Sequence, residues 1–293
     1  MPNPALSSDK EKESSQRRTF GILYPQAHPF YQMITESLEA QAIPHSINLI
    51  VKAPDEVNLE QQMRMMETMI KQKVDGIALS PIDPEAMSPL IDKAVQAGIP
   101  VICFESDAPK SRRLSYIGSD PEAKGKLMGE IIDKKLKGKG MILIEGGLSR
   151  SDNKARELQA ILSYLSNKTD VQVLEVRHHE GQQERALADL EEMIDAHPHF
   201  EALVTLDVIS SSTSILVWKA LGLKRNLLTL GMTPEVKKAL ENGQITSVIS
   251  ENEQQWGKLI IEKLLLASEW KELPVHVDSG LQEVTAADVS AGW

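Results

Sequence analysis

Cysteine, aromatic side chains and long apolar segments are all scarce in this chain of 293 residues. The single cysteine, Cys103, excludes a disulfide within the chain, and its place in the apolar run 100–104 is typical of a buried thiol. No apolar stretch approaches the roughly 20 residues that a membrane-spanning helix needs. Aromatic residues make up 4% and apolar residues 41% of the chain. This composition is ordinary for a globular protein with room for two α/β lobes.

Positive charge is also in short supply. The chain has 32 Lys and Arg against 42 Asp and Glu, a formal net charge of −10, so we expect no nucleic acid or anionic membrane surface as a partner. Residues 1–18 are polar and lack the apolar segment of a signal peptide, which predicts a disordered leader or tether. The protein is then either cytoplasmic or extracytoplasmic with its signal or anchor absent from this chain.

The chain does contain a regular alternation of β-rich runs and amphipathic helical segments. The run 19–24 predicts a strand, Pro29 suits the first turn of the next helix, and Gly98 ends a helix that begins at Pro84. Strand–helix–strand cycles of about 25–30 residues need right-handed crossovers, which predicts mostly parallel, doubly wound sheets.

A second series with the same rhythm follows residue 119 and predicts a structural duplication. Its first predicted helix runs from Pro121 to Leu136, and a later one from Ser212 to Leu221. Ligands on doubly wound sheets bind outside the carboxyl ends of the strands. The candidate site therefore comprises the segments that follow each predicted strand: 24–28, 80–83, 105–108, 145–147, 177–180, 207–209, 231–233 and 251–252.

Four stretches carry a resemblance to a known family. They are Ala27-His-Pro-Phe-Tyr31, Val74-Asp-Gly-Ile-Ala-Leu-Ser-Pro81, Ala97-Gly-Ile-Pro-Val-Ile-Cys-Phe-Glu-Ser-Asp-Ala108 and Ser115-Tyr-Ile-Gly-Ser-Asp120. In this order and spacing they resemble the sugar-binding branch of the type I periplasmic binding proteins. That family includes ribose-binding proteins and the ligand domains of lactose-repressor-type regulators. The resemblance extends from residue 19 to about residue 285.

The resemblance implies two similar doubly wound parallel-sheet α/β lobes joined by a three-strand hinge, with a ligand held between them and hinge closure around it. The expected N-terminal lobe comprises 19–118 plus 252–280, and the C-terminal lobe 119–251 plus 281–293.

The resemblance also implies ligand-binding residues. His28 stands at a family Asn, Phe30 and Tyr31 at its two aromatic positions, and Tyr24 closes the strand before them. Glu105, Asp207 and Glu251 stand at the positions of a strand-end Asp, a strand-end Asn or Asp, and a hinge Gln. Two family arginines are missing: Ser106 replaces one, and Arg156 lies two residues from the position of the other.

Three carboxylates would converge if Glu105, Asp207 and Glu251 all face the cleft, and each would raise the pKa of its neighbours. The missing arginines remove the obvious compensation. This predicts a ligand with positive charge or many hydroxyl donors. We favour a neutral, hydroxyl-rich ligand, with Tyr31 stacked on a sugar ring.

Other interpretations of single motifs are weaker. Adjacent histidines at 178–179 point to opposite faces of a strand, so we expect solvated loop histidines and no metal site. The segment 210–214 reads as an N-cap cluster, and Glu105 with Asp207 as hydroxyl acceptors rather than a glycosidase pair. We take Trp218, Trp256 and Trp270 as core residues.

The sequence therefore predicts a non-enzymatic extracytoplasmic receptor, without cofactor or metal. It would close on a sugar-like small molecule and present it to an ABC transporter or a membrane sensor histidine kinase. A cytoplasmic ligand-sensing regulatory domain is an alternative, although 18 residues before the first strand cannot hold a helix-turn-helix headpiece. A docking or signalling module with a degenerate sugar cleft is another. An enzyme is disfavoured because no dinucleotide fingerprint or nucleophile–base pair is present.

Overall fold

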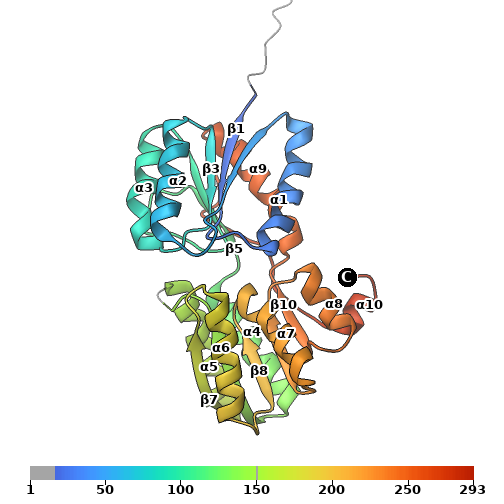
Figure 1. Ribbon diagram of the computed structural model, residues 1–293. Coiled ribbons are helices and arrows are strands. Elements are labelled where there is room, and N and C mark those ends of the chain that lie inside the picture. Colours follow the sequence, from blue (N-terminus) through green and yellow to red (C-terminus); the bar gives the residue numbers. More distant parts are fainter. Residues whose placement is uncertain (1–16, 150) are drawn as a thin grey trace, which may run out of the picture.

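The first lobe is built on a six-stranded sheet in the order β2-β1-β3-β4-β5-β11, in which every pairing is parallel (Figure 1). The computed structural model describes residues 17–149 and 151–293. The strands are β1 (Thr19–Leu23), β2 (Asn48–Lys52), β3 (Gly76–Leu79), β4 (Val101–Phe104), β5 (Ser115–Gly118) and β11 (His276–Asp278). The helices are α1 (Pro29–Ala42), α2 (Leu59–Lys71), α3 (Pro84–Gln96) and α9 (Trp256–Ser268), with 3-10 turns η1 (Ile43–His45) and η2 (Glu253–Gln255).

The second lobe repeats this plan in the order β7-β6-β8-β9-β10-β12, with one antiparallel pairing, between β10 and β12. Its strands are β6 (Lys139–Gly146), β7 (Asp170–His178), β8 (Ala202–Thr205), β9 (Asn226–Leu230), β10 (Ser247–Ser250) and β12 (Gln282–Val284). Its helices are α4 (Pro121–Leu136), α5 (Asp152–Lys168), α6 (Gln183–Ala196), α7 (Val208–Leu221), α8 (Pro234–Glu241) and α10 (Ala286–Ser290). The predicted fold class of two doubly wound α/β lobes is confirmed.

Helices cover both faces of each sheet, so each lobe has two apolar layers. Met66 and Met69 of α2 are buried against β1 and β3. Trp218 and Trp256 are also buried. The core prediction for Trp270 is wrong: it follows α9 in a left-handed turn with φ of 52°, and 53% of it is exposed.

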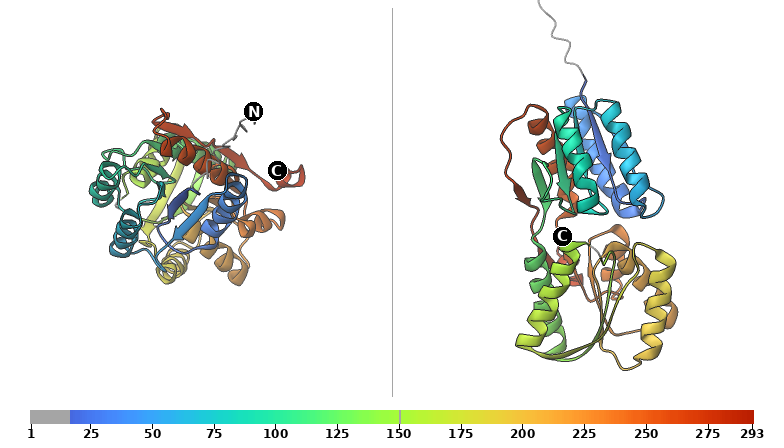
Figure 2. Two further views of the ribbon diagram at one scale, coloured as in Figure 1. Left: turned by 90° about the horizontal axis from the view of Figure 1, so that it is seen from above. Right: turned by 90° about the vertical axis from the view of Figure 1, so that its left-hand side faces the viewer.

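The chain passes between the two sheets three times, from β5 to α4, from β10 to η2 and from β11 to β12. The right-hand view of Figure 2 shows these crossings on one side of the waist. The lobe boundaries inside them stay a prediction. Of the expected leader, residues 1–16 lie outside the described residues, whereas Arg18 is part of the lobe, because its guanidinium contacts Glu269 at 2.8 Å.

Candidate ligand-binding site

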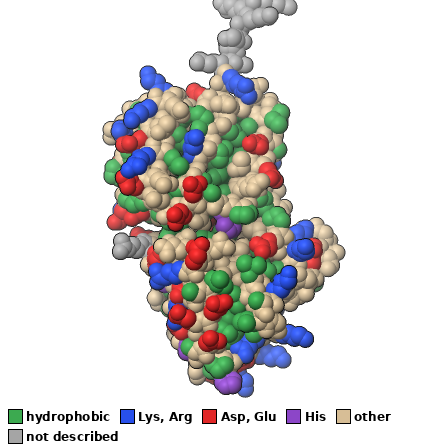
Figure 3. Space-filling model, viewed as in Figure 1, with side chains coloured by type: hydrophobic (Ala, Val, Ile, Leu, Met, Phe, Trp, Pro, Cys, Tyr) green, Lys and Arg blue, Asp and Glu red, His purple; other side chains and the backbone are tan. Residues whose placement is uncertain are grey.

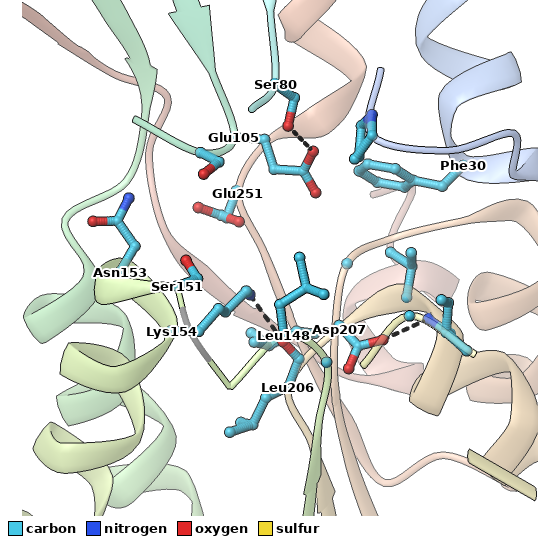
Figure 4. A pocket seen from close by; sticks show the side chains of 18 of the residues that line it. Phe30, Ser80, Glu105, Leu148, Ser151, Asn153, Lys154, Leu206, Asp207 and Glu251 are labelled. Atoms are coloured by element: carbon cyan, nitrogen blue, oxygen red, sulfur yellow. Dashed lines mark hydrogen bonds between the residues drawn. The ribbon is translucent and has the colours of Figure 1, made fainter. Parts of the chain in front are cut away.

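A cleft with about 1060 Å³ of empty space, counting its open mouth, lies between the carboxyl ends of the two sets of strands. This is where ligands bind on doubly wound sheets. Polar side chains from both lobes and from the crossings line it, and Figure 4 labels several of them. They include Ser80, Glu105, Ser106, Lys124, Lys154, Glu157, His179, Asp207, Glu251 and Glu253.

The N-lobe wall is centred on Glu105, which directly follows β4. Its backbone is in the left-handed region, with φ of 61°, a strained conformation for a residue other than glycine. The hydroxyl of Tyr31 donates to its carboxylate, 2.8 and 3.0 Å from the two oxygens, and the hydroxyl of Ser80 donates at 2.8 Å. Burial raises the pKa of Glu105, and these two hydroxyls together with the more distant charge of Lys154 only partly oppose that effect.

Aromatic rings support this wall. Tyr31 stacks on Tyr24 with ring centroids 4.8 Å apart, and Phe30 meets Tyr31 and Trp256 edge to face at 5.1 and 6.0 Å. Phe30 and Tyr31 line the cleft. Tyr24 does not: it is buried behind Tyr31, and its hydroxyl is 2.9 Å from that of Thr35, so its role is to hold Tyr31 in place.

His28 is a second predicted residue that does not line the cleft. It caps α1, where its Nδ1 accepts a hydrogen bond from the backbone N–H of Phe30 at 3.2 Å. Burial lowers the pKa of His28, although the Asp207 carboxylate on the other lobe opposes this shift.

The C-lobe wall is centred on Asp207, which caps α7. Its carboxylate accepts hydrogen bonds from the backbone N–H groups of Ile209 and Ser210 at 2.8 and 3.1 Å. The helix therefore begins at Val208 rather than at Ser212, because Asp207 supplies the N-cap and the serines lie inside the helix.

The interpretation of the histidines as solvated loop residues is wrong for His179, which is buried. The N–H of Gly181 donates to its Nδ1 at 3.1 Å, so Nε2 carries the hydrogen and donates to Asp207 at 3.0 Å. Burial alone would raise the pKa of Asp207, but His179 and the N–H of Ser210 lower it to about 2. Asp207 is therefore an ionised, partnered carboxylate.

Two lysines that the sequence analysis did not select stand on the same side of the cleft. Lys124 of α4 is buried, with its Nζ 2.8 Å from Glu251 and 3.9 Å from Glu157. Burial opposes its charge, yet these two carboxylates raise the pKa of Lys124 above its usual range. In turn, burial would raise the pKa of Glu251, and Lys124 holds it below its ordinary value. The pair is ionised.

Lys154 on the first turn of α5 is the second cation. It donates to the backbone oxygen of Leu206 at 2.9 Å and lies 3.4 Å from Glu157 (Figure 4). Helices α4 and α5 cross closely because Gly125 has no side chain: a Cβ there would lie 2.2 Å from the backbone oxygen of Glu157. This close crossing brings Lys124, Glu157 and Lys154 together, and it corrects the expectation that the cleft lacks internal compensation.

Arg156 is the third predicted residue outside the cleft. Its guanidinium is half exposed on the outer side of α5 and contacts Glu122 at 3.0 Å. Two residues along a helix point to different sides, so Lys154 faces the cleft and Arg156 does not. Six of the nine predicted residues line the cleft: Phe30, Tyr31, Glu105, Ser106, Asp207 and Glu251.

The two lobes touch at the rim of the cleft. A methyl group added to Gly181 in the C-lobe would lie 2.3 Å from a methyl carbon of Val57 in the N-lobe. Val208 of α7 also packs against the N-lobe core that contains Phe30 and Tyr31. Glu253 of η2 joins the lobes at the hinge, where its carboxylate accepts from the N–H of Met232 at 3.2 Å and from the hydroxyl of Ser250 at 2.6 Å.

Within residues 17–149 and 151–293, no group of three His, Cys, Asp or Glu side chains is arranged to hold a metal ion. None of the helices in these two ranges has both the length and the apolar character needed to cross a bilayer.

Comparisons with known proteins agree with the fold and the position of the cleft. A family model described as periplasmic binding protein domain matches residues 21–271. The ribose import binding protein RbsB of Escherichia coli K12 is 23% identical over 266 residues, which cover 88% of this chain and 87% of that protein. The D-ribose/D-allose-binding protein of Pseudomonas aeruginosa is 23% identical over 248 residues, 81% of this chain and 76% of that protein.

Among solved structures, a solute binding protein of an ABC transporter from Burkholderia graminis C4D1M in complex with D-arabinose has a TM-score of 0.87. It is 24% identical, over 94% of this chain and 97% of that chain. The family model spans most of this sequence, and the resemblance to the sugar-binding branch is confirmed. This chain belongs to the periplasmic binding protein family, in the sugar-binding branch of type I.

Proposed function

We propose that this protein is an extracytoplasmic, non-enzymatic receptor that binds a sugar-like small molecule between its lobes. The observation that carries the proposal is the cleft itself, which is lined from both lobes by hydrogen-bond acceptors and by the Phe30 ring. A ligand there would contact both lobes and would stabilise the closed arrangement. The relatives named above are binding proteins by name, and one of the solved structures contains D-arabinose.

The ligand is tested with a thermal-unfolding screen of mono- and disaccharides, polyols and amines. A ligand at 100 times its Kd adds about 2.7 kcal/mol to the free energy of unfolding. A hit should also compact the protein in small-angle scattering and should be recovered chemically unchanged. Failure of every sugar and polyol to raise the melting temperature would contradict the proposal, and turnover of a bound ligand would contradict the non-enzymatic role.

We further propose that the closed protein presents its ligand to a membrane partner, either an ABC transporter or a sensor histidine kinase. Relatives named as import binding proteins support the first. The second is supported by a structure titled XylFII-LytSN complex, 16% identical to this chain over 93% of it, with a TM-score of 0.85. Ligand-dependent co-purification with the permease or with the extracytoplasmic kinase domain would distinguish the two.

A further inference from the structure

The N-lobe wall presents a buried carboxylate that has no cation beside it. Glu105 is held by the hydroxyls of Tyr31 and Ser80, which are neutral donors. Among the described residues, no Lys, Arg or His nitrogen lies within 4.0 Å of this carboxylate. A buried charge without an opposite charge is costly, because hydroxyl donors replace only part of its hydration.

The cations that the structure places in the cleft are already engaged on the other side. Lys124 contacts Glu251 and Glu157, and Lys154 contacts Glu157 and the backbone oxygen of Leu206. The hydrogen on Nε2 of His179 goes to Asp207. Lys124 therefore cannot approach Glu105 without leaving Glu251 unpaired, and Lys154 cannot do so without giving up its contacts with Glu157 and Leu206.

The cleft also carries an excess of negative charge. The described residues that line it include five carboxylates, Glu105, Glu157, Asp207, Glu251 and Glu253, and two lysines, so the formal balance is 2 − 5 = −3 with His179 neutral. On the face seen in Figure 3, acidic side chains lie on both lobes beside their junction. Low-dielectric walls concentrate this field, which attracts cations into the cleft.

A second feature of the cleft is an acceptor without a donor. One carboxylate oxygen of Glu157, Oε1, is buried and has no hydrogen-bond partner among the described residues, and the residue lines the cleft. Buried polar atoms of folded proteins are nearly always paired. This oxygen therefore indicates a donor on the ligand at the C-lobe side, in addition to the missing cation at Glu105.

We propose that the ligand is an amino sugar whose protonated amine pairs with Glu105, while its hydroxyl groups donate to acceptors on the C-lobe side. This inference rests on the proposed receptor function and replaces the neutral sugar expected from the sequence. An ammonium group brings three donors and no acceptor, which suits the ionised Glu105 carboxylate, a group that only accepts. The ligand supplies the cation that the N-lobe lacks, so its charge-assisted bond forms only in the closed complex.

The test compares three matched pairs by titration calorimetry at about pH 6, below the pKa of such amines. The pairs are D-glucosamine with D-glucose, D-galactosamine with D-galactose, and D-mannosamine with D-mannose. We expect at least one amino sugar to bind about tenfold or more tightly than its hydroxyl counterpart. The proposal is overturned if the neutral member of each binding pair is equal or tighter, which would leave the receptor function intact. If neither sugars nor amino sugars bind, the receptor function fails together with this inference.

Two variants tie the preference to Glu105. Glu105→Gln keeps the shape and an acceptor oxygen but removes the charge, and we expect it to erase the preference for the amine. Ser106→Arg adds a guanidinium next to Glu105 in the cleft, and we expect it to turn the preference toward the neutral sugar. Circular dichroism without ligand checks that each variant is folded, and the second variant keeps the test decisive if the first does not fold. Retention of a tenfold preference for the amine in a folded Glu105→Gln protein would overturn the assignment to this residue.

Discussion

The two walls of the cleft solve the problem of buried charge in different ways. On the C-lobe side and at the hinge, Asp207 has His179, Glu251 has Lys124 and Glu157 has both lysines. On the N-lobe side, Glu105 has hydroxyl donors and a strained backbone. The difference indicates that the carboxylates Glu251 and Glu157 have their cations before a ligand arrives, although one oxygen of Glu157 still lacks a donor, whereas Glu105 obtains its cation from the ligand. Four experiments test this difference.

Removal of Lys124 should have the largest effect, because it would leave the C-lobe side as unbalanced as the N-lobe side. Lys124→Met leaves Glu251 and Glu157 buried without their shared ammonium, and we expect a loss of about 3–5 kcal/mol in the free energy of unfolding, measured with urea. Lys126→Met on the exposed side of the same helix is the matched control and should change stability by less than about 0.5 kcal/mol. Adding Glu251→Gln to Lys124→Met should recover part of this loss of stability. Equal losses in Lys124→Met and Lys126→Met would contradict the prediction.

The two walls should respond to pH in opposite directions. The pKa of Asp207 is lowered from 3.8 to about 2, so its stabilising contribution is fully present above about pH 4 and is lost as the pH falls toward 2. This contribution is about 2 kcal/mol and should be absent from Asp207→Asn. The pKa of Glu105 is raised above 4.5, so the folded state loses stability as the pH rises above that value.

Unfolding free energies measured across this pH range for the parent and each single variant check both signs. The free energy of unfolding of Glu105→Gln should increase relative to that of the parent as the pH rises from 4.5. Difference curves are needed because burial also raises the pKa of Glu145, to about 9, and that of Glu253. Parallel curves for the parent and Glu105→Gln would show that both states of Glu105 are equally well accommodated, which would remove the contrast between the walls.

A smaller effect, on ligand affinity, is expected where the two lobes touch at the rim of the cleft. Gly181→Ala would place a methyl group against Val57, and this overlap exists only when the lobes are closed. We expect about tenfold weaker ligand binding, since such overpacking costs about 1–3 kcal/mol. Gly98→Ala is the matched control: its φ of 83° resembles the 82° of Gly181, but nothing lies within 4 Å of the added carbon. If both variants lose affinity equally, backbone strain and not lobe contact is responsible. Val57→Ala should restore the affinity of Gly181→Ala only if lobe contact is responsible.

The smallest effect is expected at Arg156, which marks the outer limit of the site. Arg156→Ala removes an exposed pair with Glu122, so stability should change by less than about 0.5 kcal/mol and ligand affinity by less than about twofold. Lys154→Ala, two residues away on the cleft side, should weaken binding about tenfold. The reverse order of the two affinities in a titration would mean that α5 is rotated relative to the arrangement described above.

The fold was predictable because its local signals are strong. The predicted helices at Pro29, Pro84 and Pro121 begin where expected, since a proline stands at the first helical position in each case. Strand ends also located Ser80, Glu105 and Asp207, because their place at the edge of a parallel sheet depends on topology alone.

The pairing of the cleft carboxylates with lysines was not predictable in the same way. Lys124 and Lys154 lie on helices, and which side of a helix faces the cleft depends on how α4 and α5 cross. Arg156 was selected because it lies near the position of a family arginine, but it is two residues from Lys154, the side chain that faces inward. His179 lies in a strand-end segment and could have been selected as a cleft residue. It was not, because it was considered together with His178 as a pair of solvated loop histidines.

The order in which the chain leaves the ribosome conflicts with the order of the lobes. The N-lobe core needs Trp256, Ile260 and Leu264 of α9, and its sheet needs β11 at residues 276–278, all of which are synthesised after β10 of the C-lobe. By residue 250, five of the six strands of the C-lobe already exist. The lobe that begins first therefore still lacks α9 and β11 after most strands of the second lobe have been made. Until α9 is made, the apolar strands of this lobe lack its cover, which makes the nascent N-lobe the segment most in need of protection by chaperones.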